Sequence, residues 1–96
     1  MDQKLPAKQM EFYKRIDEIL YYKWDPIGIA DGVLARDEYQ EYLPKVFRLA
    51  LDNDSSQPIA EYLGTIITVN IGLISCQAHN LAIAKLIMEV KIELNL

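Results

Sequence analysis

The run Trp24-Asp25-Pro26-Ile27-Gly28 constrains this chain most, because it ends a helix at a defined residue. A proline disfavours the α conformation of the residue before it, so Asp25 must leave the helical path directly after the tryptophan. Pro26 then fixes its own φ, and Gly28 permits a positive φ, so the chain can turn sharply here. We therefore expect a helix that ends at Trp24 and a turn that begins at Asp25.

The segment before this run has the periodicity of an amphipathic helix. From about Ala7 to Trp24 the apolar residues recur on one face and the charged residues lie away from it. The apolar face consists of Phe12, Tyr13, Ile16, Ile19, Leu20 and Trp24. We expect residues 1–6 to form a frayed end, with Pro6 near the first helical position.

The loop after Trp24, up to about Leu34, alternates apolar residues with turn-forming ones. Loops usually run over the surface and are polar, so this pattern indicates an ordered loop that folds back onto the core. The pair Asp31-Gly32 is typical of a β-hairpin. No strand-like run flanks the pair, and we reject that interpretation.

Residues 36–52 keep helical spacing but contain Pro44, which disrupts a regular helix interior. We favour a short turn over residues 37–42, followed by a helix with Pro44 in its first turn. A single kinked helix is the alternative.

Two further helices are expected in the second half of the chain. Ser55 or Ser56 is placed to cap the first of them, with Pro58 in its first turn. Residues 66–69 of this helix are β-branched, but no second strand exists to pair with them, so we expect them to stay helical. Gly72 is suited to end it.

The last helix should run from Cys76 to about Leu94, capped by Ser75. Its apolar residues cover more than half of its circumference, so it should be the central element: Leu81, Ile83, Ala84, Leu86, Ile87, Met88 and Val90. The sequence thus predicts an all-α fold, a compact single-domain bundle of about four helices over residues 1–96, with an ordered loop after the first helix.

The charge balance limits the classes of partner. Fourteen acidic and ten basic residues give a net charge of −4, which repels nucleic acids and anionic membranes and favours a basic protein partner. The single cysteine, Cys76, excludes an internal disulfide and fits a reducing compartment. The apolar stretch 63–74 is interrupted by polar residues and glycines, and the chain starts without a signal-like apolar run. We expect a cytoplasmic protein with no membrane segment.

The sequence lacks the residue patterns of catalytic and metal sites. Cys76 and His79 lie one helical turn apart, but a zinc site needs three or four ligands, so we expect His79 to have a capping or packing role. The run Asp52-x-Asp54-x-Ser56 resembles the start of a calcium loop but lacks the required glycine and glutamate. No nucleophile, base and orienting group can be assembled. We expect no catalytic, cofactor-binding or metal-binding residues, and no enzyme.

Acidic residues and tyrosines gather around residues 25–42, which is typical of a protein interface where charge steers the encounter and aromatic residues anchor the complex. An ordinary acidic surface is an equally good interpretation, and both stay open. No lysine or arginine occurs between Leu49 and Ala84. The candidate partner-binding residues are Asp25, Asp31, Asp37, Glu38, Tyr39, Glu41 and Tyr42.

The chain resembles a family of small bacterial all-helical proteins over residues 16–90. The resemblance is carried by the runs Trp24–Gly28, Asp37–Tyr39 with Tyr42–Pro44, Ile59–Leu63 and Gly72-Leu73. Members share a Trp-Asp-Pro-(apolar)-Gly signature and are mostly of unknown function, and some resemble immunity proteins that accompany secreted or contact-dependent toxins. The resemblance implies structural roles for Trp24, Pro26 and Gly28 and supplies no catalytic residues.

The sequence therefore leads to one functional hypothesis and one rival. The first is an immunity protein, a small acidic helical inhibitor of a basic toxin, such as a nuclease domain of a contact-dependent inhibition system. The rival is a structural or regulatory helical module that self-associates through excess apolar surface and has no toxin partner.

Overall fold

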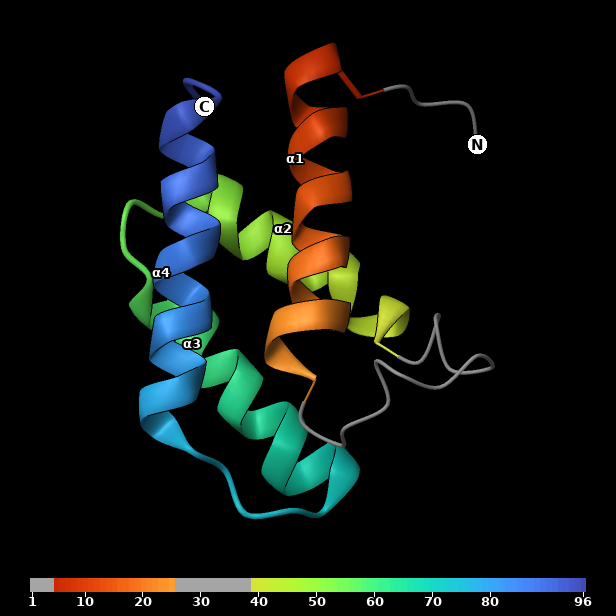
Figure 1. Cartoon of the computed structure of the whole chain (residues 1–96), viewed down its shortest axis with the longest axis vertical. Helices are drawn as coiled ribbons and strands as arrows, with labels where there is room; N and C mark the ends of the chain where they lie inside the picture. Colours follow the sequence, from red (N-terminus) through yellow and green to blue (C-terminus); the bar gives the residue numbers. More distant parts are fainter. Residues whose placement is uncertain (1–4, 26–38) are drawn as a thin grey trace.

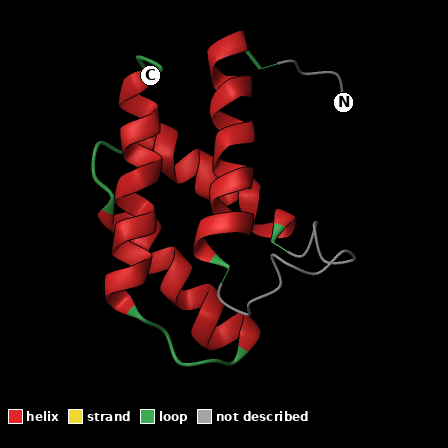
Figure 2. Cartoon of the chain, viewed as in Figure 1, coloured by secondary structure: helices red, strands yellow, loops and turns green. Residues whose placement is uncertain are grey.

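Helices make up every regular element that the computed structural model describes, over residues 5–25 and 39–96 (Figures 1 and 2). The predicted all-α class is confirmed, and no strand occurs in these two ranges. The α-helices of the described residues are α1 (Ala7–Glu18), α2 (Leu43–Asp52), α3 (Gln57–Thr65) and α4 (Gln77–Glu93).

The first helix ends at Trp24, as the sequence predicts. From Ile19 to Trp24 the helix α1 continues as a wider π-helical turn, η1, in which the N–H of Asp25 donates to the carbonyl of Leu20 over 3.1 Å. Asp25 has a φ of 36°, in the left-handed region that aspartate tolerates better than most residues. The helix cannot continue through a residue in that conformation.

Pro44 lies in the first turn of α2, where its missing N–H would have no intrahelical acceptor. A 3₁₀ turn, η2 (Gln40–Tyr42), precedes α2. Over residues 39–52 this arrangement confirms the short turn followed by a helix and excludes the kinked helix, whereas residues 37 and 38 of the predicted turn lie outside the described residues.

A second π-helical turn extends α3. Residues Ile66–Ile71 form η3, and Gly72, with a φ of 83°, ends it. The β-branched segment is therefore helical, as expected. At the other end of α3, Ser56 occupies the cap position without a side-chain bond, and Ser55 Oγ accepts the N–H of Gln57 over 3.1 Å.

The start of α4 corrects one prediction. Cys76, with extended backbone angles, occupies the cap position that we assigned to Ser75. The hydroxyl of Ser75 does not cap the helix and instead accepts a 2.7 Å hydrogen bond from Asn80 Nδ2. The difference arises because the Asn80 side chain, in the first turn of the same helix, engages this oxygen atom.

Helix α4 is the central element, as predicted, since it contacts α1, η1, α2 and α3 (Figure 1). The buried apolar residues of the described segments form one cluster between these helices. None of the described helices is both long and apolar enough to cross a lipid bilayer.

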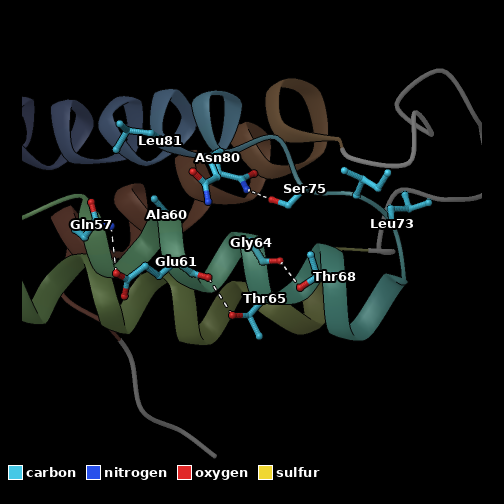
Figure 3. A pocket seen from close by; sticks show the side chains of 12 residues that line it. Gln57, Ala60, Glu61, Gly64, Thr65, Thr68, Leu73, Ser75, Asn80 and Leu81 are labelled. Carbon is cyan, nitrogen blue, oxygen red and sulfur yellow. Dashed lines mark hydrogen bonds between the residues drawn. The ribbon is translucent and has the colours of Figure 1, made fainter.

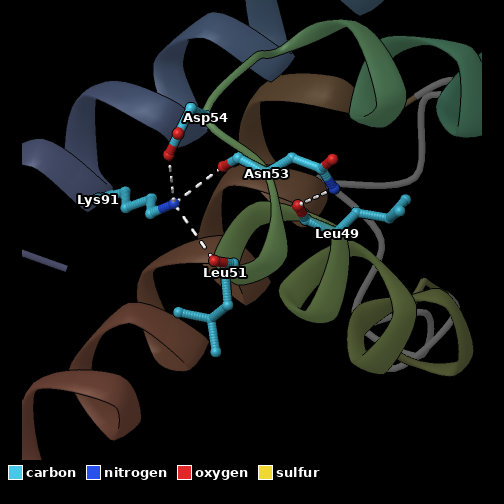
Figure 4. A network of polar contacts seen from close by, with 5 residues as sticks. All are labelled: Leu49, Leu51, Asn53, Asp54 and Lys91. Carbon is cyan, nitrogen blue, oxygen red and sulfur yellow. Dashed lines mark hydrogen bonds and ion pairs between the residues drawn. The ribbon is translucent and has the colours of Figure 1, made fainter.

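Lys91 connects α4 to the linker after α2 (Figure 4). Its buried side chain donates to the carbonyl oxygens of Asn53, over 2.9 Å, and Leu51, over 3.4 Å. A cation suits this position because the last carbonyls of a helix carry partial negative charge. The ion pair with Asp54, at 3.9 Å, adds little because the aspartate side chain is fully exposed.

Replacing Lys91 with methionine should lower the free energy of unfolding by about 1.5–3 kcal/mol, because hydrogen bonds to a charged group are worth that much. Urea denaturation measures the loss. Lys85→Met, at an exposed position of the same helix, is the control and should change stability by no more than about 0.5 kcal/mol. Equal effects of the two substitutions would contradict the role assigned to Lys91.

Candidate partner-binding surface

Trp24 is held against the first turn of α4 by hydrogen bonds that involve its side chain and its backbone. It is 2% exposed, and its Nε1–H donates to Asn80 Oδ1 over 3.0 Å. The carbonyl oxygen of Trp24 lies 3.0 Å from His79 Nε2, which must donate because a carbonyl can only accept. The burial of Trp24 agrees with its place on the apolar face of the first helix, and of the capping or packing role expected for His79 the structure shows capping of the Trp24 carbonyl. The sequence did not indicate the contribution of Asn80.

Tyr39 requires a correction, because it is a core residue and not one of the partner-binding residues to which we assigned it. It is 2% exposed, and its ring centroid lies 5.4 Å from that of Trp24. Its hydroxyl donates to Asp25 Oδ1 over 2.8 Å. Two residues assigned to partner binding thus form an internal contact that supports the left-handed conformation of Asp25.

The other predicted partner-binding residues are only partly described. Glu41 is exposed and Tyr42 is half-buried, so both remain accessible to a partner. Asp31, Asp37 and Glu38 lie outside the described residues.

Tyr62, on α3, lies within electrostatic reach of this acidic segment. Burial raises the pKa of the Tyr62 hydroxyl above its ordinary value of 10.0, and the negative charge of Glu41 raises it further. Lys45 Nζ lies 4.9 Å from the centroid of the Tyr62 ring. The start of α2 and the exposed side of α3 therefore belong to one continuous surface.

Glu41→Gln should lower the pKa of Tyr62 without returning it to 10.0, because burial is the larger cause. Unfolded Tyr62 loses its proton first as the pH rises through 10.0, so this residue makes the folded state less stable in alkali. A ¹³C NMR titration of the tyrosine ring measures the pKa. Glu89→Gln, on α4, removes the same charge and should leave the Tyr62 pKa unchanged.

A groove runs between α3 with η3 and the first turn of α4, and the sequence did not predict it (Figure 3). Its volume is about 910 Å³. Along α3 and η3 it is lined by small residues one turn apart, Ala60, Gly64 and Thr68, and on the opposite side by Ser75 and Asn80. The regular spacing of small residues is a signal in the sequence, but the packing of α3 and η3 beside the start of α4 is not.

Apolar side chains line the end of this groove at the linker between η3 and α4. Leu73 is 44% exposed and Ile74 is 97% exposed. Val69, in the preceding π-helical turn, is also exposed. Exposed apolar residues that occur singly need no explanation, but a group beside a groove is typical of an interaction surface.

The charge of the groove is negative. Glu61 is the charged residue that lines it, and no lysine, arginine or histidine of the described chain does so. Likewise, the described residues contain no group of three or more side chains that could hold a metal ion. The groove therefore offers a ligand apolar surface, one carboxylate, and a stretch of α3 where small side chains let the ligand come close to the backbone.

Comparison with known proteins assigns this chain to no family. No family model matches the chain, and neither a curated protein nor a solved structure matches it significantly. The chemistry of the exposed residues must therefore indicate the class of partner.

Proposed function

We propose that this chain is an immunity protein, which binds and neutralises a cognate bacterial toxin in the cytoplasm. The expected target is a basic toxin domain, such as the nuclease domain of a contact-dependent inhibition system. One reason for this proposal is the resemblance of residues 16–90 to small bacterial helical proteins, some of which are similar to immunity proteins.

The observation that carries the proposal is the absence of lysine and arginine from the groove beside α3 and from the stretch of sequence that contains it. Between Leu49 and Ala84 the sequence has no lysine or arginine, and the groove beside α3 is lined by one charged residue, Glu61, together with apolar and uncharged polar residues. Such a surface attracts a cationic protein by charge and holds it by apolar contact. It repels nucleic acid, whose phosphates need lysine or arginine.

Neutralisation needs no chemical step by this chain. A nuclease binds its substrate through a cationic cleft, and an acidic protein that covers the cleft excludes the nucleic acid. Charge attraction also speeds the association of the two proteins, which matters when a toxin must be captured before it acts.

Co-expression tests this function. The C-terminal domain of the large secreted protein encoded beside this gene should arrest growth when expressed alone, and this chain should restore growth. A second acidic helical protein of equal net charge is the control and should give no protection. Growth arrest that persists while this chain is present and soluble would refute the proposal, as would a neighbouring gene that encodes no such toxin.

Self-association is the second candidate function, and scattered exposed apolar residues favour it. Val69 lies in η3 and Ile74 follows it. Ile92, which is as exposed as Val69, belongs to the last turns of α4 at the opposite end of the molecule (Figure 1). Because these residues do not share one face, they favour this candidate less than the groove favours a partner. Sedimentation equilibrium distinguishes the two, since a self-associating module must form dimers or larger species at high concentration.

A further inference from the structure

We propose that the groove between α3 and α4 is the docking site for a cationic amphipathic helix of the partner. The apolar face of that helix would lie on Leu73 and the small residues of α3, and a lysine or arginine would pair with Glu61. This inference rests on the proposed function and specifies where and by what chemistry the partner binds.

The shape of the groove fits a helix of about three turns. The lining residues of α3 and η3 extend from Gln57 to Thr68, which corresponds to about 16 Å of helix at 1.5 Å per residue. Ala60, Gly64 and Thr68 form one row along this length. The distance between packed helices depends on the side chains at their contact, so a row of small residues permits a close approach.

Gly64 is not required by the packing of this chain. A Cβ atom at this position would lie 3.6 Å from Asn80 Nδ2 and 3.6 Å from Ser75 Oγ, which are ordinary contact distances. Its φ is not in the left-handed region either. Glycine destabilises a helix relative to alanine. An external ligand that needs a low groove floor gives a reason for this residue, whereas the fold gives none.

The threonines of the groove turn their hydroxyl groups away from a ligand. Thr65 Oγ1 donates to the carbonyl of Glu61 over 3.1 Å, and Thr68 Oγ1 donates to that of Gly64 over 3.0 Å (Figure 3). Both hydroxyl protons are therefore used within the helix itself, which makes these two side chains less polar toward a ligand.

Charge selects a cationic occupant. The carboxylate of Glu61 accepts a hydrogen bond from Gln57 Nε2 over 3.1 Å, and no cation of this chain lines the groove. A lysine or arginine on the partner would supply the missing positive charge. A second copy of this chain fits less well, since each copy has a net charge of −4.

NMR titration of the ¹⁵N-labelled protein tests the inference. The probe is a synthetic amphipathic helix of leucine, alanine and lysine with about 18 residues, a length at which isolated helices begin to be stable. Amide shifts should concentrate on Gly64, Thr68 and Ser75, and salt should weaken binding. A matched peptide with glutamate in place of lysine should not bind. Shifts centred away from the groove, or shifts on dilution without peptide, would overturn the inference.

Three variants make the test specific. Thr68→Trp obstructs the groove and Glu61→Lys reverses its charge, so each should weaken peptide binding by about tenfold or more. The control Glu89→Lys makes the same charge change on an exposed part of α4 outside the groove and should alter affinity by less than about twofold. Native-like amide spectra establish that each variant is folded.

Gly64→Ala tests the separate claim about the groove floor. It should raise Tm by about 2–8 °C, because alanine favours the helix and its methyl group fits. A fall in Tm would show that the fold requires glycine and would overturn this step.

The peptide assay is independent of any toxin. Growth protection without peptide binding would therefore refute the docking site in the groove and leave the proposed function standing.

Discussion

Replacing Trp24 with alanine should lower the free energy of unfolding by about 3–5 kcal/mol, the usual cost of removing a large aromatic side chain from a core. The indole ring is almost completely buried, contacts the ring of Tyr39 and is bonded to Asn80. Its loss should therefore leave a cavity and deprive the buried Oδ1 atom of Asn80 of its donor. Urea denaturation followed by far-UV circular dichroism measures the effect without relying on tryptophan fluorescence.

Tyr22 provides the matched control, because it lies two residues earlier in the same π-helical turn and is 60% exposed. It forms an edge-on contact with Tyr21, with ring centroids 4.8 Å apart. Such a pair is worth no more than about 1.5 kcal/mol, so Tyr22→Ala should stay below that value. If Tyr22→Ala lowered the free energy of unfolding as much as Trp24→Ala does, the cost would come from disturbing the π-helical turn and not from removing a buried side chain.

Replacing Asn80 with leucine should lower the free energy of unfolding by about 2–4 kcal/mol, although leucine has similar size and favours helices. Among the described residues every buried side-chain nitrogen and oxygen atom has a hydrogen-bond partner. The substitution would leave the indole N–H of Trp24 buried without an acceptor, which costs about 1–3 kcal/mol. It would also remove the bond to Ser75.

A double-mutant cycle with Trp24→Phe separates the hydrogen bond from general packing. Phenylalanine has no N–H group, so Asn80→Leu should cost less in that background, with a coupling energy of about 0.5–3 kcal/mol. Asn70→Leu, at an exposed position of η3, is the control for the polarity change. Additive effects of the two core substitutions would contradict the assigned hydrogen bond.

The sequence predicted the features that local rules determine. Pro26 limits the conformation of Asp25, and the helix does end at Trp24. Pro44 favours a first helical turn, and it occupies one. Gly72 permits a positive φ, and η3 ends there. Each of these effects depends on one residue and its immediate neighbours.

The remaining features depend on contacts between residues far apart in the chain. Asn80 looks like a surface residue of an amphipathic helix until Trp24, 56 positions earlier, is placed beside it. The acidic neighbours of Tyr39 indicated exposure, but its partner Asp25 lies 14 positions away. The π-helical turns were missed because a pattern with a 3.6-residue period does not reveal one wider turn.

The candidate surface was predicted in charge but not in shape. The sequence showed that residues 49–84 lack lysine and arginine, and the groove lies within this stretch. Its shape depends on how α3 packs against α4, which follows from contacts between residues far apart in the chain. Of the seven predicted partner-binding residues, Tyr39 moved into the core, and the groove residues were absent from the set.

Titration of the purified toxin domain with this chain tests the central claim most directly. The toxic activity of that domain, measured in vitro, should fall in proportion to the added chain and disappear at one molar equivalent. High salt should slow the approach to inhibition, because charge attraction speeds the encounter. Full toxin activity in the presence of excess folded chain would contradict the claim that this protein neutralises its partner by binding.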